Sequence, residues 1–130
     1  MKFYIGSCFK NIDNVRYLRD KLKEIGLTHT YDWTQNQRAS TVNQLREIGQ
    51  SEKAAVLESD FVIILLPAGK GSHIELGMAL GQNKKVYLHS STGEIENFET
   101  TSTFYHLPEV ESCKGTLDDL TEMIKSQLLM

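Results

Sequence analysis

A run of six consecutive apolar residues at positions 61–66, Phe-Val-Ile-Ile-Leu-Leu, constrains the fold of this chain more than any other feature. A strand that is apolar at every position, and not only at every second one, is buried on both faces. Such strands belong to parallel sheets, whose crossover helices cover either face. The run therefore predicts a central strand of an α/β sheet.

Short apolar runs alternate with helical patterns along the rest of the chain. Strands are expected at residues 3–8, 28–33, 61–66, 84–89 and 104–107. Patterns with a helical period are found at residues 11–25, 41–59, 72–82 and from 116 onward, and polar loops at 34–40 and 90–102. Gly49 interrupts the second helical pattern, and Ser51 offers a cap where a new helix could begin. Thr116 is the expected N-cap of the last helix.

Five strands separated by helices predict a doubly wound α/β sheet. Right-handed crossovers and the length of 130 residues favour a flavodoxin-like, five-stranded parallel sheet of order 2-1-3-4-5, with helices on both faces. Ligands bind such sheets outside the carboxyl ends of the strands where the order reverses, here between the first and third strands. The corner at residues 6–8 and the corner at residues 67–75 are therefore expected to face each other across a site.

Composition narrows the classes of function. With 40% apolar and 24% charged residues, the chain reads as one globular domain over residues 1–130. A net charge of −3 and a pI near 5.8 argue against a nucleic-acid polymer or a membrane surface as partner. Cys8 and Cys113 fit a reduced compartment and show no metal-ligand spacing. Without a signal-peptide pattern or a membrane-spanning run, a cytoplasmic location is expected.

The corner after the central apolar run carries the most informative motif. Gly69 and Gly71 precede a helical pattern, whose first N–H groups can hold anions or sugar hydroxyls. Glu75 is expected on the first turn of that helix, where the helix dipole favours its ionised form. An ionised acid in this place suits a nucleophile that attacks a sugar carbon better than it suits a proton donor.

Three features together resemble the nucleoside 2-deoxyribosyltransferase-like proteins. The first strand ends in Tyr-Ile-Gly-Ser at residues 4–7, Glu52 stands eight residues before the Asp-led strand at 60–63, and residues 71–77 match Gly-x-x-x-Glu-Leu-Gly. Members of this family cleave or exchange the N-glycosidic bond of (deoxy)nucleosides or of their 5′-monophosphates. The resemblance implies a small-molecule nucleoside or nucleotide as partner and no metal or organic cofactor. It also implies a homodimer or larger assembly, in which a neighbouring chain can complete the pocket.

The resemblance assigns roles to individual residues. Glu75 resembles the nucleophile that attacks C1′, Glu52 resembles the second acid, and Tyr4 resembles the residue that positions the nucleophile. Ser7 and its loop would hold the 5′ end of the substrate. The expected substrate-binding residues are Gly6, Ser7, Asp32, Trp33, Gly69, Gly71 and Ser72.

Asp32 and Trp33 enter this set from their place at the end of the second expected strand. There Trp33 could stack on a base and Asp32 could bind a hydroxyl, although packing or a dimer contact is the alternative for Trp33.

Cleavage of an N-glycosidic bond suits a pair of acids. Positive charge develops near C1′ and the ring oxygen, so that one carboxylate stabilises or bonds to C1′ and a second acid protonates the departing base. Glu52 is expected near the site only if a new helix begins at Ser51. One continuous helix from Thr41 would place Glu52 mid-helix and farther from the chemistry, as a solvated residue.

Two departures from the family pattern leave the substrate open. Gly69 stands where relatives often carry Asp or Ser, and Cys-Phe-Lys at residues 8–10 replaces the arginine that typically follows the Gly-Ser corner in the phosphohydrolase branch. Residues 67–75 are also similar to Pro-Gly-Gly-x-Gly-Thr-x-x-Glu of the cytokinin-activating phosphoribohydrolases, with Ala68 and Ser72 substituted. A non-catalytic nucleotide-binding or signalling module is a further alternative.

Overall fold

The computed structural model describes residues 1–128 and contains a five-stranded, all-parallel sheet of order β2-β1-β3-β4-β5. The strands are β1 (Lys2–Gly6), β2 (Thr28–His29), β3 (Phe61–Leu65), β4 (Lys85–His89) and β5 (Val110–Cys113). The strand order confirms the predicted topology. The order reverses between β1 and β3, so their carboxyl ends frame the expected binding edge.

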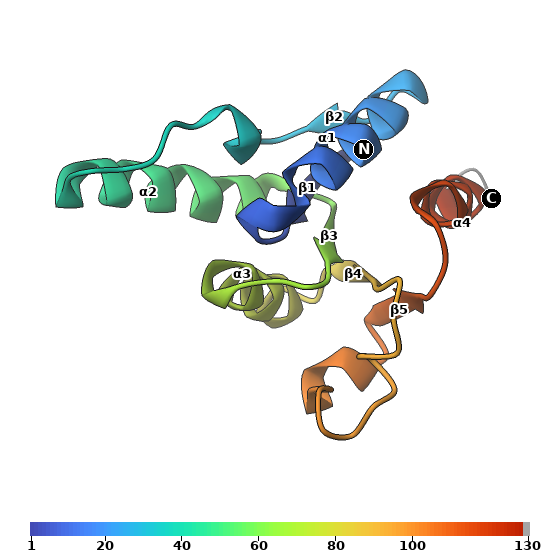
Figure 1. Ribbon diagram of the computed structural model, residues 1–130. Helices are drawn as coiled ribbons and strands as arrows, with labels where there is room; N and C mark the ends of the chain where they lie inside the picture. The colour runs from blue at the N-terminus through green and yellow to red at the C-terminus, as the bar shows by residue number, and fades with distance from the viewer. Residues whose placement is uncertain (129–130) are drawn as a thin grey trace.

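Four α-helices cover the sheet, with α1 and α4 on one face and α2 and α3 on the other (Figure 1). Their bounds are α1 (Ile12–Glu24), α2 (Val42–Glu58), α3 (Lys70–Gly81) and α4 (Leu117–Leu128). Short 3₁₀ helices are η1 (Phe9–Asn11), η2 (Trp33–Gln35) and η3 (Thr103–His106). Within residues 1–128, no helix combines the length and the apolar character that a bilayer crossing requires.

The central strand β3 is buried along its whole length, as its uninterrupted apolar run predicts. It pairs with β1 on one side and β4 on the other, and Gly6 at the end of β1 lies opposite Ile64. The core packs against both faces of this strand, which fixes the carboxyl ends of β1 and β3 side by side. The adjacent corners are thereby brought to one edge of the sheet.

Strand β2 is shorter than the expected strand at residues 28–33. Only Thr28 and His29 pair with β1, and the chain then enters η2. Asp32 causes this change, because its side chain accepts a hydrogen bond from the backbone N–H of Thr34 at 3.0 Å and caps the 3₁₀ turn. A short polar side chain that captures a nearby N–H competes with the sheet ladder.

The strand predicted at residues 104–107 is wrong, since this segment forms η3 and β5 begins only at Val110. The Ser102 side chain accepts a hydrogen bond from Phe104 N–H, which starts a turn in place of a strand. The sequence does not indicate strand β5, because this strand lies at the sheet edge and includes Glu111, which is only partly buried. It therefore lacks a continuous apolar run.

Helix α2 runs without a break through Gly49, so the structure shows one continuous helix, the second of the two alternatives, and no restart at Ser51. Its C-terminal end is anchored: Ala55 and Val56 are buried, and Lys84 Nζ donates hydrogen bonds to the carbonyl oxygens of Val56, Leu57 and Ser59 at 3.1, 2.6 and 2.5 Å. Its N-terminal half projects beyond the sheet (Figure 1). A glycine in a helix costs about 1 kcal/mol relative to alanine, too little to break a 17-residue helix held in this way.

The expected cap of the last helix is confirmed. Asp119 N–H donates to Thr116 Oγ1 and Thr116 N–H donates to Asp119 Oδ2, both at 3.0 Å. These reciprocal bonds form a capping box.

Candidate active site

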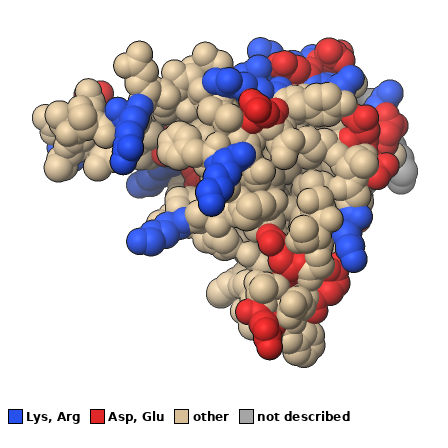
Figure 2. All heavy atoms as spheres, in the orientation of Figure 1, with Lys and Arg blue, Asp and Glu red and all other residues tan. Residues whose placement is uncertain are grey.

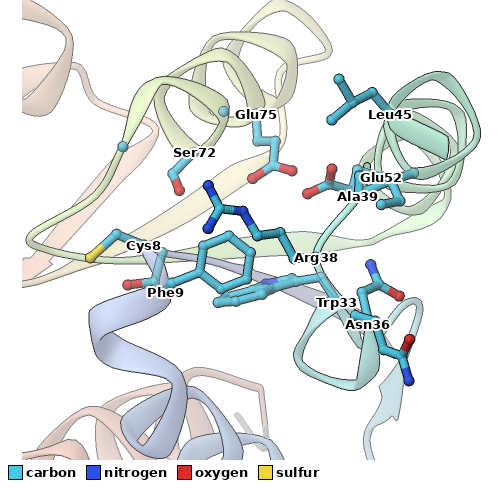
Figure 3. Close-up of a pocket in the computed structure, with 15 residues that line it drawn as sticks. Cys8, Phe9, Trp33, Asn36, Arg38, Ala39, Leu45, Glu52, Ser72 and Glu75 are labelled. Carbon is cyan, nitrogen blue, oxygen red and sulfur yellow. The ribbon is translucent and has the colours of Figure 1, made fainter. Parts of the chain in front are cut away.

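A cavity of about 460 Å³ lies at the predicted edge of the sheet, between the end of β1 and the start of α3. Its walls come from the β1–α1 corner, the loop after β2, the middle of α2 and the first turns of α3 (Figure 3). Of the residues expected from the sequence, those that line it are Ser7, Trp33, Glu52, Gly69, Gly71, Ser72 and Glu75. The structure therefore brings together residues from four separate segments, as the topology predicts.

Two acids meet on the floor of this cavity around one tyrosine. Tyr4 is fully buried, and its hydroxyl lies 2.6 Å from Glu75 Oε2 and 3.2 Å from Glu52 Oε2. A phenol carries a single hydrogen and cannot donate fully to two ionised carboxylates at once. The arrangement therefore favours a state in which the two carboxyl groups hold one proton between them.

The electrostatics of the pair agree with this geometry. Glu75 is 6% exposed, and burial raises the pKa of its carboxyl group to about 8, with the charge of Glu52 acting in the same direction. The hydrogen bond from Tyr4 opposes the shift in part. Burial and the two acids also raise the pKa of Tyr4, so that its hydroxyl stays protonated and remains a donor.

Two expectations about Glu75 are corrected here. Helix α3 begins at Lys70, two residues earlier than predicted, so Glu75 lies on its second turn and not on its first. The helix dipole acts mainly within the first turn. Burial outweighs it, and the carboxyl group is held toward its neutral form.

Glu52 reaches the site from the middle of a continuous helix, contrary to the expectation that only a restart at Ser51 would bring it there. Helix α2 passes beside the carboxyl edge of the sheet, so a mid-helix position faces Tyr4. The carboxyl groups of Glu52 and Glu75 point toward each other (Figure 3).

Gly6 allows Glu75 to approach the end of β1. A Cβ atom at this position would lie 2.8 Å from Glu75 Oε1 and 2.9 Å from Ile64 Cδ1, closer than real Cβ atoms come. Glu75 would have to turn away from this point to make room, which would move its carboxyl group relative to the Tyr4 hydroxyl. The glycine of the first corner is therefore a steric requirement of the acid pair.

Ser7 joins the two corners directly. Its hydroxyl donates to the carbonyl oxygen of Leu65 at 2.8 Å and accepts from Asn11 Nδ2 at 2.9 Å. The end of β1 is thus bonded to the end of β3, which confirms that the two corners face each other. The role of Ser7 in holding the 5′ end of a substrate stays a prediction.

Asp32 does not line this cavity, contrary to the expectation. Its carboxylate pairs with Arg19, with 2.6 Å between Asp32 Oδ2 and Arg19 Nη1, and caps η2. Its neighbour Trp33 does line the cavity; the indole N–H donates to the carbonyl oxygen of Ile5 at 2.7 Å and the ring meets Phe9 edge to face. Stacking of Trp33 on a base stays a prediction.

Several lining residues were not found by sequence reasoning. The outer wall consists of Phe9, the loop from Asn36 to Ala39, and Leu45 and Ile48 of α2. The two aliphatic residues have helical spacing, which indicates a covered helix face and nothing more specific. The loop has no period, and its place over the cavity depends on where α2 begins.

His73 links the corner at residues 67–75 to Tyr105. Its Nδ1 lies 2.8 Å from the carbonyl oxygen of Gly69 and its Nε2 lies 2.7 Å from the Tyr105 hydroxyl. Because a carbonyl oxygen only accepts, Nδ1 carries a proton and donates it to Gly69. The backbone of Gly69, which lines the cavity, is held in this way.

Comparisons with known proteins were made by family profile, by sequence and by structure. No family profile matches the sequence, and no curated protein matches it.

Solved structures do match the fold. The CMP N-glycosidase BcmB of Clostridium botulinum is 16% identical, with a TM-score of 0.62 over 96% of this chain and 99% of that one. A 2-deoxyribosyltransferase from Bacillus psychrosaccharolyticus is 17% identical, with a TM-score of 0.68 over 93% and 90%. A conserved protein from Enterococcus faecalis V583 is 16% identical, with a TM-score of 0.68 over 98% of both chains. At such identities the likeness shows a shared fold.

Proposed function

We propose that this protein cleaves or transfers at the N-glycosidic bond of a (deoxy)nucleoside or its 5′-monophosphate, as a nucleoside 2-deoxyribosyltransferase-like enzyme with Glu75 as nucleophile. The observation that carries the proposal is the buried pair of acids, Glu75 and Glu52, held by the Tyr4 hydroxyl on the floor of a cavity. Two structures of the same fold support it, because their names describe a CMP N-glycosidase and a 2-deoxyribosyltransferase.

The acid pair supplies both functions that the reaction needs. The shared proton rests mainly on Glu75, so the reactive state forms when this proton passes to Glu52 and leaves Glu75 ionised. A Glu75 oxygen bonds to C1′ while the C1′–N bond breaks, and the electron pair of that bond stays on the base nitrogen, which takes the proton from Glu52. Water or a second base then attacks C1′ and gives its proton to Glu52, and the ester bond to Glu75 breaks. Protons and charge balance over the cycle.

Release of free base tests the proposal. The protein is incubated with ribo- and deoxynucleosides and their 5′-monophosphates, and free base is followed by chromatography. We expect release or exchange in the wild type and a loss of at least about 10³-fold in Glu75→Gln, since the nucleophile is removed. Glu122→Gln, which changes an exposed acid on α4 away from the cavity, is the matched control and should retain full activity.

Two results would contradict the proposal. One is base release of equal rate in Glu75→Gln and wild type. The other is tight binding of nucleotides that are never altered, which would favour the non-catalytic binding module. A 2-fluoro substrate analogue that leaves an acid-stable mass increment on Glu75 would establish the covalent intermediate directly. Addition of a second base to the reaction distinguishes a transferase from a hydrolase.

We further propose that a second copy of this chain packs on the projecting half of α2, in a cytoplasmic homodimer. Val42 is 69% and Leu45 is 61% exposed there, although Leu45 lines the cavity. A two-fold contact between such helices would bury these side chains and close the outer wall. Sedimentation should give a dimer, and Leu45→Glu should shift it toward monomer. A monomeric wild type at assay concentration would refute this assembly.

A further inference from the structure

Arg38 is a cation that reaches into the cavity without a protein partner. Its side chain comes from the loop after η2 and ends facing Ser72 and Glu75 (Figure 3). Among residues 1–128 it makes no ion pair and no hydrogen bond, and neither Glu52 nor Glu75 lies within ion-pair distance of it. Neutralisation of the acid pair therefore does not account for its position.

The start of α3, opposite Arg38, presents unused hydrogen-bond donors. The N-cap is Gly69, which has no side chain to cap the helix, so the N–H groups of Gly71 and Ser72 have no partner within the helix. Ser72 is only 4% exposed, and its hydroxyl points into the cavity (Figure 3) without a hydrogen bond to any described residue. The hydroxyl is therefore open to the cavity and free to bond to a ligand oxygen there.

These donors share one chemical preference. Backbone N–H groups at a helix start, a hydroxyl and a guanidinium group together suit a phosphate, whose oxygens only accept when ionised. The distribution of charge over the surface is consistent with an anionic ligand. Basic side chains predominate between α2 and α3, and acidic ones gather on the opposite side and over the loop after β4 (Figure 2). The corner at Cys8-Phe9-Lys10 holds no arginine, so Arg38 is the guanidinium group that faces this cavity.

Helix geometry relates the phosphate position to the acid. Ser72 and Glu75 are three residues apart and therefore face the same side of α3, separated by about one turn, or roughly 5 Å along the axis. In a nucleotide a comparable separation divides the 5′-phosphate from C1′. A phosphate held at Ser72 would thus place C1′ near Glu75.

We propose that Arg38 and the start of α3 bind a 5′-phosphate, so that the substrate is a nucleoside 5′-monophosphate and Arg38 determines this specificity. The inference rests on the proposed function for the position of C1′. The positive charge of Arg38 also offsets the repulsion that a phosphate dianion would meet from the acids one turn away.

The fluorescence of Trp33 offers a measurement of ligand binding. This residue is the single tryptophan of the chain and lines the cavity, so its fluorescence reports occupancy without any need for catalysis. Glu75→Gln protein is titrated with a nucleoside, its 5′-monophosphate, its 3′-monophosphate and inorganic phosphate. We expect the 5′-monophosphate to bind at least about 10-fold more tightly than the nucleoside, the magnitude typical of charge-assisted hydrogen bonds.

Substitution of Arg38 isolates its contribution. Arg38→Ala should remove about 10-fold or more of the 5′-monophosphate affinity and change nucleoside affinity by less than about 3-fold. Lys23→Ala is the matched control, because it removes a positive charge from an exposed site on α1 outside the cavity, and it should bind like the parent. Arg38 is itself exposed, so its removal should leave the fold intact.

Three results would overturn the inference: equal affinity for nucleoside and 5′-monophosphate, preference for the 3′-monophosphate, or equal weakening of both ligands by Arg38→Ala. Its failure is distinguishable from failure of the proposed function. Base release from nucleosides that depends on Glu75, without any advantage for a 5′-phosphate, would leave the function standing and refute the phosphate site. Binding of the 5′-monophosphate that depends on Arg38, without base release by the wild type, would support the phosphate site and refute the proposed function.

Discussion

The two walls of the cavity are built in different ways. The inner wall, formed by β1 and α3, is held by short contacts: the Tyr4 hydroxyl on Glu75, the Ser7 hydroxyl on Leu65, and a backbone approach that only Gly6 permits. The outer wall, formed by the loop from Asn36 to Ala39 and the projecting half of α2, is largely exposed. Under the proposed function, the inner wall fixes the position of Glu75, the proposed nucleophile, and the outer wall is free to vary with the substrate.

The largest effect is expected from Gly6→Ala, which tests how rigid the inner wall is. The new methyl group would overlap Glu75 Oε1 and Ile64 Cδ1 and displace the acid from the Tyr4 hydroxyl. We expect at least about 100-fold loss of kcat/KM, and destabilisation of about 1–3 kcal/mol as in other overpacked cores. Steady-state kinetics and urea unfolding measure both. An active, stable Gly6→Ala protein would show that the inner wall yields as readily as the outer one.

The buried acid also makes stability depend on pH. The pKa of Glu75 is about 8 in the folded chain against an ordinary value of 4.5, so the folded state binds more protons between these two pH values. The free energy of unfolding therefore falls as pH rises through this window. Glu75→Gln lacks this loss, so we expect its stability relative to wild type to rise by a few kcal/mol between pH 5 and pH 9.

Chemical denaturation of both proteins at pH 5, 7 and 9 measures this trend. The difference between the two proteins cancels other titrating groups, such as His29, whose pKa burial lowers to about 4. A stability difference that stays constant from pH 5 to 9 would contradict the assignment of a neutral buried Glu75.

Tyr4→Phe removes one hydroxyl from the inner wall and little volume. Because the Tyr4 hydrogen bond favours the ionised form of Glu75, its loss should raise the pKa of Glu75 further. We expect kcat/KM to fall about 10- to 100-fold, the size of one hydrogen bond to a charged group, and its pH profile to move toward alkaline pH. A residue that only packs would leave the pH profile in place.

The smallest effect on activity is expected from Asp32→Ala, beside the outer wall. It removes the cap of η2 and the partner of Arg19, so a loss of about 1–2 kcal/mol in stability is expected. Since Asp32 does not line the cavity, kcat/KM should change less than about 3-fold. Loss of activity without loss of stability would place Asp32 in substrate binding after all.

The sequence predicts the inner wall well because its signals are local. Each part of this wall has its own short sequence pattern: a fully apolar strand, a glycine corner, and an acid at a fixed spacing in a helix. The strand order of the sheet then brings these parts together. Glu75, Gly6 and Ser72 lie at the site that the topology predicts, whereas Glu52 reaches it from a mid-helix position that was expected to lie farther away.

The errors arise where a side chain competes with the backbone pattern or where a neighbour overrides it. Asp32 and Ser102 capture nearby N–H groups and turn expected strands into 3₁₀ helices. Lys84 and the buried end of α2 keep a helix intact through Gly49. Arg38 lies in an irregular loop, and no local pattern indicates that its side chain turns into the cavity.

The attachment of α2 at one end has a consequence for local opening. Its last turn is tied to Lys84 and to buried Ala55 and Val56. Its first turn is bonded to the residues just before it, through the Thr41 cap and the hydrogen bonds from Ser40 to Gln44. Amide hydrogen exchange should therefore be graded along the helix, fast near Leu45 and slow near Val56. Glu52 stands where this gradient changes, so fraying from the free end would separate the two acids before the rest of the protein unfolds.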